Sequence, residues 1–167
     1  MKIYITGGSG TGKTTYAKYL AKKHNITYLG LDSVKWRIDT DKAFTKCHPR
    51  EERVKILKKF LADTPDWICD GTYYQDWVND VIRSADIVII IDTPTLVRHI
   101  RCIRRAFLHQ NRDTLSLVAL WKLLMWSHNY RRKDLPGLCA KLDAFGKKYI
   151  IIKSKHLTEM LWRQFLI

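Results

Sequence analysis

The chain has 167 residues, and its 30 Lys and Arg outnumber its 16 Asp and Glu, which gives a formal net charge of +14. This length predicts one compact domain over residues 1–167, and a hydrophobic content of 46% with 11% aromatic residues excludes a disordered chain. No apolar stretch reaches the roughly 20 residues of a membrane-spanning helix, no signal-peptide pattern is present, and the four cysteines form no CxxC pair. We therefore expect a cytoplasmic protein with free thiols and no membrane partner.

Strands and helices alternate along the chain. Strands are predicted at residues 2–6, 27–31, 67–69, 87–91 and 149–152, and helices at residues 13–24, 49–62, 76–83, from 94 onward, from 113 to about 130, and at 157–165. The run Ile87–Ile91 consists of β-branched residues and has no polar face, which indicates a central strand covered by helices on both sides. We therefore predict an α/β fold, a three-layer α/β/α sandwich with a parallel, five-stranded sheet.

Two helices in the second half of the chain are expected to form a helical lid over residues 98–134. Thr93–Pro94 provides the N-cap and the first-turn proline of the first helix. Its apolar positions make one stripe, which comprises Leu96, Ile100, Ile103 and Phe107. Its arginines lie largely off that stripe. Asp113 caps the second helix, and Pro136–Gly137 ends the segment. We interpret the Trp and Leu side chains of this lid as core, with docking on another subunit or partner as the alternative.

The most specific motif lies between the first predicted strand and the first predicted helix. It fits the pattern G-x-x-x-x-G-K-[ST] and comprises Gly7, Gly8, Ser9, Gly10, Thr11, Gly12, Lys13 and Thr14. Glycines let consecutive backbone N–H groups curl around phosphate oxygens, and the positive end of the following helix points at them. Lys13 would contact the β- and γ-phosphates and Thr14 would bind Mg²⁺, with Thr15 completing the nucleotide-binding set. The sequence therefore predicts a P-loop NTPase fold that uses ATP and Mg²⁺.

Three acids follow predicted strands, namely Asp32, Asp70 and Asp92. The carboxyl edge of a parallel sheet is where ligands bind, so these side chains are expected on the side of the phosphate loop. For Asp32 and Asp70 a functional role is favoured, because one acid can orient water on Mg²⁺ and another can accept a hydrogen bond from an acceptor hydroxyl. For Asp92, which directly precedes Thr93–Pro94, capping or turn formation is favoured.

The positive charge is concentrated in the lid. Residues 94–134 contain 9 Lys and Arg against 2 Asp and Glu. Arg98, Arg101 and Arg105 are spaced three and four residues apart, so they share a neighbourhood on the first lid helix, and no nearby acid relieves their repulsion. Either they form a solvated face, or they bind a polyanion, for which the arginine fork is suited because it pairs with phosphate oxygens.

These motifs resemble the nucleoside- and nucleotide-kinase group of P-loop proteins, which includes adenylate and shikimate kinases. The run Trp67–Tyr73 is similar to the strand-Asp-Gly element of adenylate kinases. Ile91–Pro94 with Arg101 and Arg105 resembles their last strand, Asp-x-Pro turn and lid arginines. The resemblance follows nearly the whole chain in order and implies the same fold and a phosphoryl-transfer activity.

Within this group the chain is most similar to the topology modulation (FlaR-like) proteins, which share Leu31–Asp32 followed by Trp36 and the element Asp70-Gly71-x-Tyr73. The resemblance assigns roles to Lys13 and Thr14 (phosphate and Mg²⁺), Asp70 (the water shell of the metal), Arg101 and Arg105 (ATP and the transferring phosphate) and Asp32 (the acceptor). It thus implies Lys13, Asp32, Arg101 and Arg105 as catalytic residues and Thr14 with Asp70 as the metal site. Charge neutralisation by the closing lid would support catalysis.

The acceptor side departs from the adenylate-kinase pattern. Thr72 and Tyr74 follow the Asp-Gly pair, and the arginine expected after that pair is missing. This departure argues against a nucleoside monophosphate as the acceptor. Candidate residues of the acceptor pocket are Asp32, Trp36, Arg37, Tyr73 and Tyr74, since aromatics beside basic residues suit a ring or base bearing negative charge; the aromatic and basic members could equally be core or surface.

We predict an ATP- and Mg²⁺-dependent kinase that acts on a small hydroxylated or nucleoside/nucleotide-like acceptor. The alternative is a nucleic-acid-binding regulator of the topology modulation type or a polynucleotide kinase, which the net charge and the six tryptophans support. No helix-turn-helix, zinc-finger or RNA-recognition signature accompanies them. A third interpretation is a nucleotide-binding module without chemistry. The sequence defines neither the acceptor nor the oligomeric state.

Overall fold

The computed structural model describes residues 1–37, 46–108 and 117–153 of the chain. In chain order its elements are β1 (Lys2–Thr6), α1 (Lys13–His24), β2 (Thr27–Gly30), α2 (Leu31–Lys35), α3 (Arg50–Asp63), β3 (Trp67–Gly71), a 3-10 turn η1 (Asp76–Val78), α4 (Asn79–Ser84), β4 (Ile87–Asp92), α5 (Thr95–Leu108), α6 (Leu117–Ala144) and β5 (Tyr149–Lys153). The helix predicted at residues 157–165 and the predicted cap at Asp113 lie outside the described residues.

The described strands form one sheet in the order β2-β3-β1-β4-β5, and every neighbouring pair is parallel. The prediction of a parallel, five-stranded sheet is confirmed. Because β1 lies between β3 and β4, the chain leaves β1 where the strand order reverses, the position at which open α/β sheets bind ligands. The register places Asp70 beside both Ile5 and Gly30, so the ends of three strands lie level at this edge.

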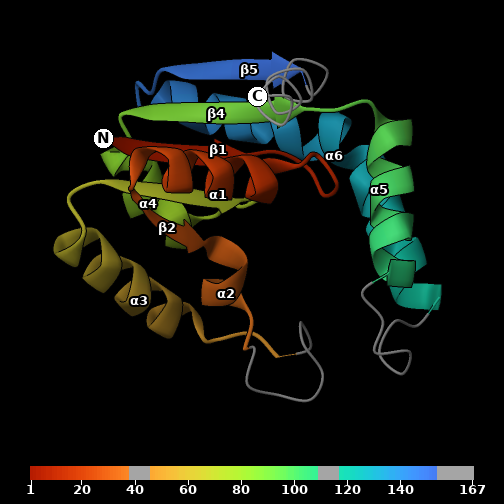
Figure 1. Ribbon diagram of the computed structural model, residues 1–167, viewed down its shortest axis with the longest axis horizontal. Coiled ribbons are helices and arrows are strands. Elements are labelled where there is room, and N and C mark those ends of the chain that lie inside the picture. Colours follow the sequence, from red (N-terminus) through yellow and green to blue (C-terminus); the bar gives the residue numbers. More distant parts are fainter. Residues whose placement is uncertain (38–45, 109–116, 154–167) are drawn as a thin grey trace.

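Helices cover both faces of the sheet, as Figure 1 shows. Side chains of a strand alternate between faces, so Ile3 and Ile5 pack against α1 while Tyr4 between them packs on the opposite face. That second face is covered by α3, α4 and α6 through the buried residues Leu57, Val81, Ile82, Leu138 and Leu142. The structure therefore confirms the predicted three-layer sandwich.

The predicted end of the second lid helix is wrong. Pro136 lies inside α6, which continues to Ala144. An interior proline costs about 3 kcal/mol, but Leu138 and Leu142 beyond it are fully buried in the core, and each buried leucine contributes about 1.5–3 kcal/mol. The helix ends instead at Ala144, and the chain turns at Gly146, whose φ of +61° is left-handed, with the N–H of Lys147 donating to the Leu142 carbonyl at 2.9 Å.

The orientation of α5 is the second difference from the sequence-based expectation. The apolar stripe points outward, with Leu96 72% exposed and Ile100 and Phe107 also exposed, whereas Arg98 and Cys102 on the other side of the helix are buried. Trp121 of α6 is likewise exposed, so the interpretation of the Trp and Leu side chains of the lid as core is wrong for Trp121. The polar side of α5 faces inward because its neighbours there are backbone carbonyls of the loop and of α6, which require donors.

A pair of leucine substitutions tests this orientation. Leu142→Ala should lower the free energy of unfolding by about 2–4 kcal/mol, because it leaves a cavity in the core. Leu96→Ala should change it by less than about 0.5 kcal/mol, because that side chain is already in solvent. Urea unfolding of both variants measures the difference, and a large loss for Leu96→Ala would show that the stripe is covered.

Candidate functional site

The loop between β1 and α1 has the backbone that its glycines predict. Gly10 and Gly12 have φ angles of +78° and +91°, which other residues rarely adopt. The hydroxyl of Thr11 donates to the Gly8 carbonyl at 2.9 Å and closes the loop on itself. The first turn of α1 follows at once, with the Tyr16 N–H donating to the Gly12 carbonyl at 3.0 Å. The N-terminal end of a 12-residue helix thus lies at the loop, an arrangement that favours anions.

Three predicted residues converge on Lys13, the first residue of α1. Burial lowers the pKa of its amine, the carboxylates of Asp70 and Asp32 raise it, and the guanidinium of Arg105 lowers it again. These neighbours come from β3, α2 and α5, which are far apart in sequence. The fold therefore brings the predicted catalytic charges within electrostatic range of one another at the loop.

The two predicted metal ligands are in direct contact. The hydroxyl of Thr14 donates to Asp70 Oδ2 at 2.7 Å, and Asp70 is only 3% exposed. Hydroxyl and carboxylate oxygens are ligands that Mg²⁺ accepts, and in nucleotide sites the ion takes few protein ligands because phosphates and water supply the rest. The described parts of the chain contain no cluster of three or more His, Cys, Asp or Glu that could hold a metal without such help.

Tyr28 of β2 belongs to this site, although the sequence analysis did not identify it. Its hydroxyl donates to Asp70 Oδ1 at 2.5 Å, so both oxygens of the carboxylate have a donor. Burial and the bond to Asp70 raise the pKa of Tyr28 above its ordinary value. No local pattern could have found this contact, because the two residues meet only when β2 pairs with β3.

Asp32 lies in the first turn of α2, directly after β2. Its carboxylate is exposed and accepts a hydrogen bond at 2.6 Å from the hydroxyl of Tyr73. Two predicted acceptor residues are thus in contact with each other. Of the remaining candidates, Arg37 forms an ion pair with Glu52 at 3.7 Å, and Tyr74 lies against Gly137 of α6 rather than beside Asp32.

Two cations that the sequence analysis did not single out border this acceptor side. The amine of Lys35 lies 4.7 Å from the ring centre of Tyr73 and 4.9 Å from that of Trp36. Arg53 of α3 stacks 5.3 Å from the ring centre of Trp77, which in turn packs 5.1 Å from Tyr73. Neither Lys35 nor Arg53 forms an ion pair within the part of the chain that the structure describes.

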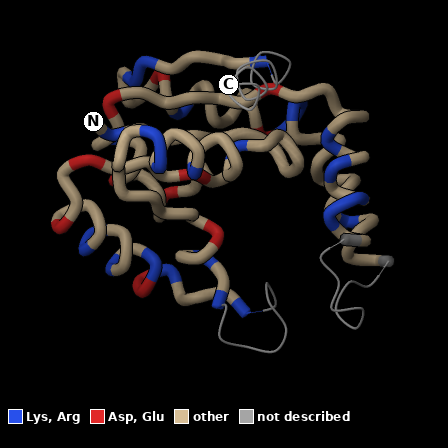
Figure 2. The backbone as a smooth tube through the Cα atoms, viewed as in Figure 1, with Lys and Arg blue, Asp and Glu red and all other residues tan. Residues whose placement is uncertain are grey.

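The predicted lid arginines lie on the loop. Arg101 Nη1 is 3.4 Å from the carbonyl of Gly10 and 3.3 Å from that of Thr11, and Arg105 Nη2 is 3.4 Å from the hydroxyl of Ser9. Figure 2 shows basic residues gathered along α5, whereas α3 carries both signs of charge. The arginine row is therefore not a solvated face alone, because part of it contacts the loop.

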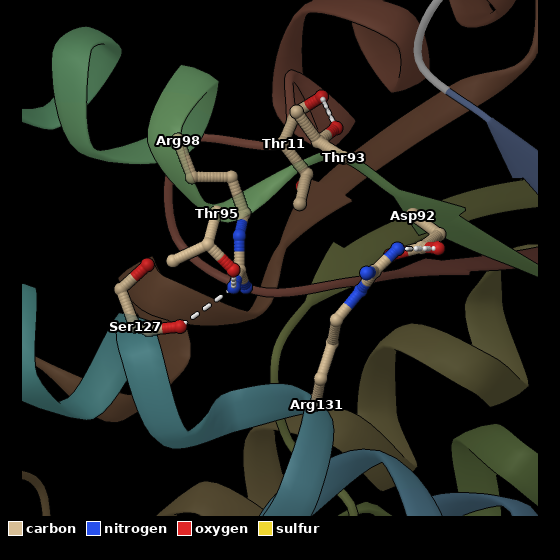
Figure 3. A network of polar contacts seen from close by, with 7 residues as sticks. All are labelled: Thr11, Asp92, Thr93, Thr95, Arg98, Ser127 and Arg131. Atoms are coloured by element: carbon tan, nitrogen blue, oxygen red, sulfur yellow. Dashed lines mark hydrogen bonds and ion pairs between the residues drawn. The ribbon is translucent and has the colours of Figure 1, made fainter.

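Asp92 has the structural role that the sequence favours, through a different contact. Its carboxylate forms a two-pronged ion pair with Arg131 of α6, one branch of which is the Nε–Oδ1 bond of 2.9 Å (Figure 3). The predicted N-cap at Thr93 is wrong, because α5 starts at Thr95 and the Thr93 hydroxyl donates to the Thr11 carbonyl at 3.3 Å. Both residues thus tie the end of β4 to its surroundings.

A parallel sheet of this order, with the glycine-rich loop after its central strand, defines the P-loop kinase fold. The crystal structure of shikimate kinase from Bacteroides thetaiotaomicron superposes with a TM-score of 0.58, covering 96% of this chain and 98% of that one at 17% sequence identity. The uncharacterized protein YqaC of Bacillus subtilis (strain 168) is 32% identical over 114 residues, which are 68% of this chain.

The aligned region spans 61% of the length of YqaC. No protein-family model matches the chain. Within the described residues, no helix is both long and apolar enough to cross a membrane. The comparisons therefore establish the fold of the chain, and its chemistry has to be argued from the site.

The Tyr28–Asp70 contact predicts a pH dependence of stability. The raised pKa of Tyr28 means that the folded protein keeps a proton that the unfolded chain loses near pH 10, so the free energy of unfolding falls as the pH rises past 10. Tyr28→Phe removes this group. The free energy of unfolding of the variant should therefore fall less steeply with pH, by a slope that corresponds to about one bound proton. Urea unfolding at several values between pH 8 and 11 measures the slopes, and parallel curves for the two proteins would contradict the assignment.

Proposed function

We propose that the protein is an ATP- and Mg²⁺-dependent phosphotransferase whose acceptor is a small hydroxylated or nucleoside/nucleotide-like molecule. The observation that carries the proposal is the convergence of Asp70, Asp32 and Arg105 on Lys13 at the glycine-rich loop. Phosphoryl transfer needs little covalent help from the protein, and positioning with charge neutralisation accounts for most of the catalysis. A loop, a lysine, two acids and lid arginines supply both.

The donor side of the site would bind the triphosphate. Backbone N–H groups of residues 8–14 and the amine of Lys13 would contact its oxygens, and Arg101 with Arg105 would offset charge on the transferring group. Both arginines contact the loop, so they lie on the side of the site where the triphosphate would bind.

The metal side would be formed by Thr14 and Asp70. When bound, Mg²⁺ neutralises charge on the β- and γ-phosphates. The hydroxyl of Tyr28 donates to the other oxygen of the Asp70 carboxylate, which helps to fix the orientation of this carboxylate. Lys13 lies within electrostatic range of both acids, so the site combines one amine with two carboxylates.

The acceptor side would be formed around Asp32. Its carboxylate would accept the proton of an attacking hydroxyl, and the hydroxyl of Tyr73 donates to it. Lys35 and Arg53 lie beyond it without carboxylate partners among the described residues. Their charges support an acceptor that bears a negative group in addition to its hydroxyl.

The structure supports the nucleic-acid alternative less than it supports a small-molecule kinase. Arg131, in the basic run at the end of the lid, is used by Asp92, while its neighbours Arg132 and Lys133 are exposed. The narrower similarity to topology modulation proteins also stays a prediction. A coupled ATP-consumption screen over nucleosides, nucleotides, small hydroxy acids and 5′-hydroxyl oligonucleotides separates these classes, since one selective acceptor identifies the reaction.

Lys13→Ala should abolish phosphoryl transfer, because the β- and γ-phosphates lose their lysine contact, while the circular dichroism spectrum stays that of the folded protein. Lys22→Ala, at an exposed position of the same helix, is the matched control and should keep full turnover. Turnover retained in Lys13→Ala would overturn the proposed function.

Asp32→Asn should lower kcat by about 10²–10⁴-fold, because the amide cannot accept the proton of the acceptor. The affinity for ATP should stay within about twofold, since Asp32 lies on the acceptor side. Asp63→Asn at the exposed end of α3 serves as control. Steady-state kinetics with direct ATP titration measure both quantities, and a loss confined to ATP affinity would contradict the assigned role.

A further inference from the structure

Gly8 is a glycine for a different reason from its neighbours in the loop. Gly7, Gly10 and Gly12 have positive φ angles, but Gly8 does not, so its backbone would accept any residue. A Cβ at Gly8 would collide with Arg98 Nη1 and would lie 3.2 Å from the ring of Tyr130. The space that a side chain would occupy at position 8 is therefore filled by the guanidinium of Arg98.

Arg98 reaches this place from α5 and is held by α6. Its Nη2 donates to the Ser127 carbonyl at 2.7 Å and to the Thr95 hydroxyl at 3.1 Å (Figure 3). The Tyr130 ring centre lies 5.7 Å from the guanidinium carbon. These contacts fix one edge of the guanidinium on α6 and leave Nη1 against Gly8.

The charge of Arg98 is not neutralised within the described residues. The side chain is 1% exposed, its Nε has no hydrogen-bond partner, and it forms no ion pair. Asp92 is near, but its carboxylate is bound to Arg131, so two guanidinium groups share one acid. Burying a cation without a partner is costly, which suggests that an anion completes this site.

We propose that Arg98 is a further cation of the phosphate site, acting on the bound triphosphate across Gly8 from the side of the loop that faces α5 and α6. This inference rests on the proposed function of the loop as the ATP site. Charges in a buried environment are screened far less than those in water, so phosphates in the loop would balance Arg98 without touching it. Arg98 would thus be a positioning residue, and Arg101 and Arg105 would contact the nucleotide.

The same geometry couples Gly8 to Arg98. A methyl group at position 8 must push the guanidinium away, so Gly8→Ala and Arg98→Met should remove the same interaction. Their effects on ATP affinity should then be far from additive, as expected for residues that act through one contact. This coupling separates a role of Arg98 in the phosphate site from a general contribution to packing.

The test is direct titration of the full-length protein with ATP and with inorganic tripolyphosphate, which carries the phosphates without a base. Arg98→Met should weaken binding of both probes by about tenfold or more, and Arg98→Lys, which keeps the charge, by no more than about threefold. Arg104→Met, on the exposed side of α5, should bind like the parent. Thermal unfolding without ligand should show that each variant is folded.

Equal binding by Arg98→Met and the parent would overturn the inference, as would equal losses in Arg98→Met and Arg98→Lys or a loss seen with ATP and not with tripolyphosphate. If Arg98→Met does not fold, Gly8→Ala takes its place, and unchanged affinity in that variant would equally overturn it. Should the parent bind ATP no better than Lys13→Ala, the proposed function fails and this inference with it. If turnover is normal and depends on Lys13, but the Arg98 variants bind both probes like the parent, this inference alone is overturned.

Discussion

The packing of α5 on the glycine-rich loop is the contact on which the site depends. A Cβ at Gly10 would come within 2.6 Å of the Arg98 carbonyl oxygen, so the helix can approach only because the loop has no side chain there. Below this contact, Thr93 donates to the carbonyl of Thr11 and ties the end of β4 to the same loop. The close approach brings the guanidinium of Arg101 onto the loop, where the proposed function requires a cation.

This packing also explains why α5 presents its apolar stripe to solvent. A helix normally buries its apolar side, yet here the neighbours on the inner side are carbonyl groups of Gly10, Thr11 and Ser127, which need donors. Arginine side chains donate hydrogen bonds to these carbonyls, which apolar side chains could not do. Arginines therefore occupy the inner side, and Leu96 with Phe107 lies outside.

The two acids of the site are held by the same kind of hydrogen bond. Asp70 and Asp32 each accept a hydrogen bond from a tyrosine hydroxyl, supplied by Tyr28 and Tyr73 at 2.5 and 2.6 Å. Tyr28 lies on β2, next to the strand β3 that carries Asp70. Tyr73 follows β3, and Asp32 follows the neighbouring strand β2. Carboxylates that are oriented in this way need little rearrangement on binding, which suits a reaction whose catalysis is largely positioning.

Local sequence patterns were enough to predict the alternation of strands and helices, the parallel sheet and the loop, because these follow from the spacing of apolar residues, glycines and the Gly-Lys-Thr run. They also pointed to Asp70, whose place after a buried strand is a local property. The folded arrangement alone shows which side of α5 is buried, how far α6 continues beyond Pro136, that Tyr28 bonds to Asp70 and that Arg98 lies against Gly8. Those outcomes depend on partners distant in the chain, such as the carbonyl of Ser127 for Arg98, and a sequence pattern does not record which distant groups will meet.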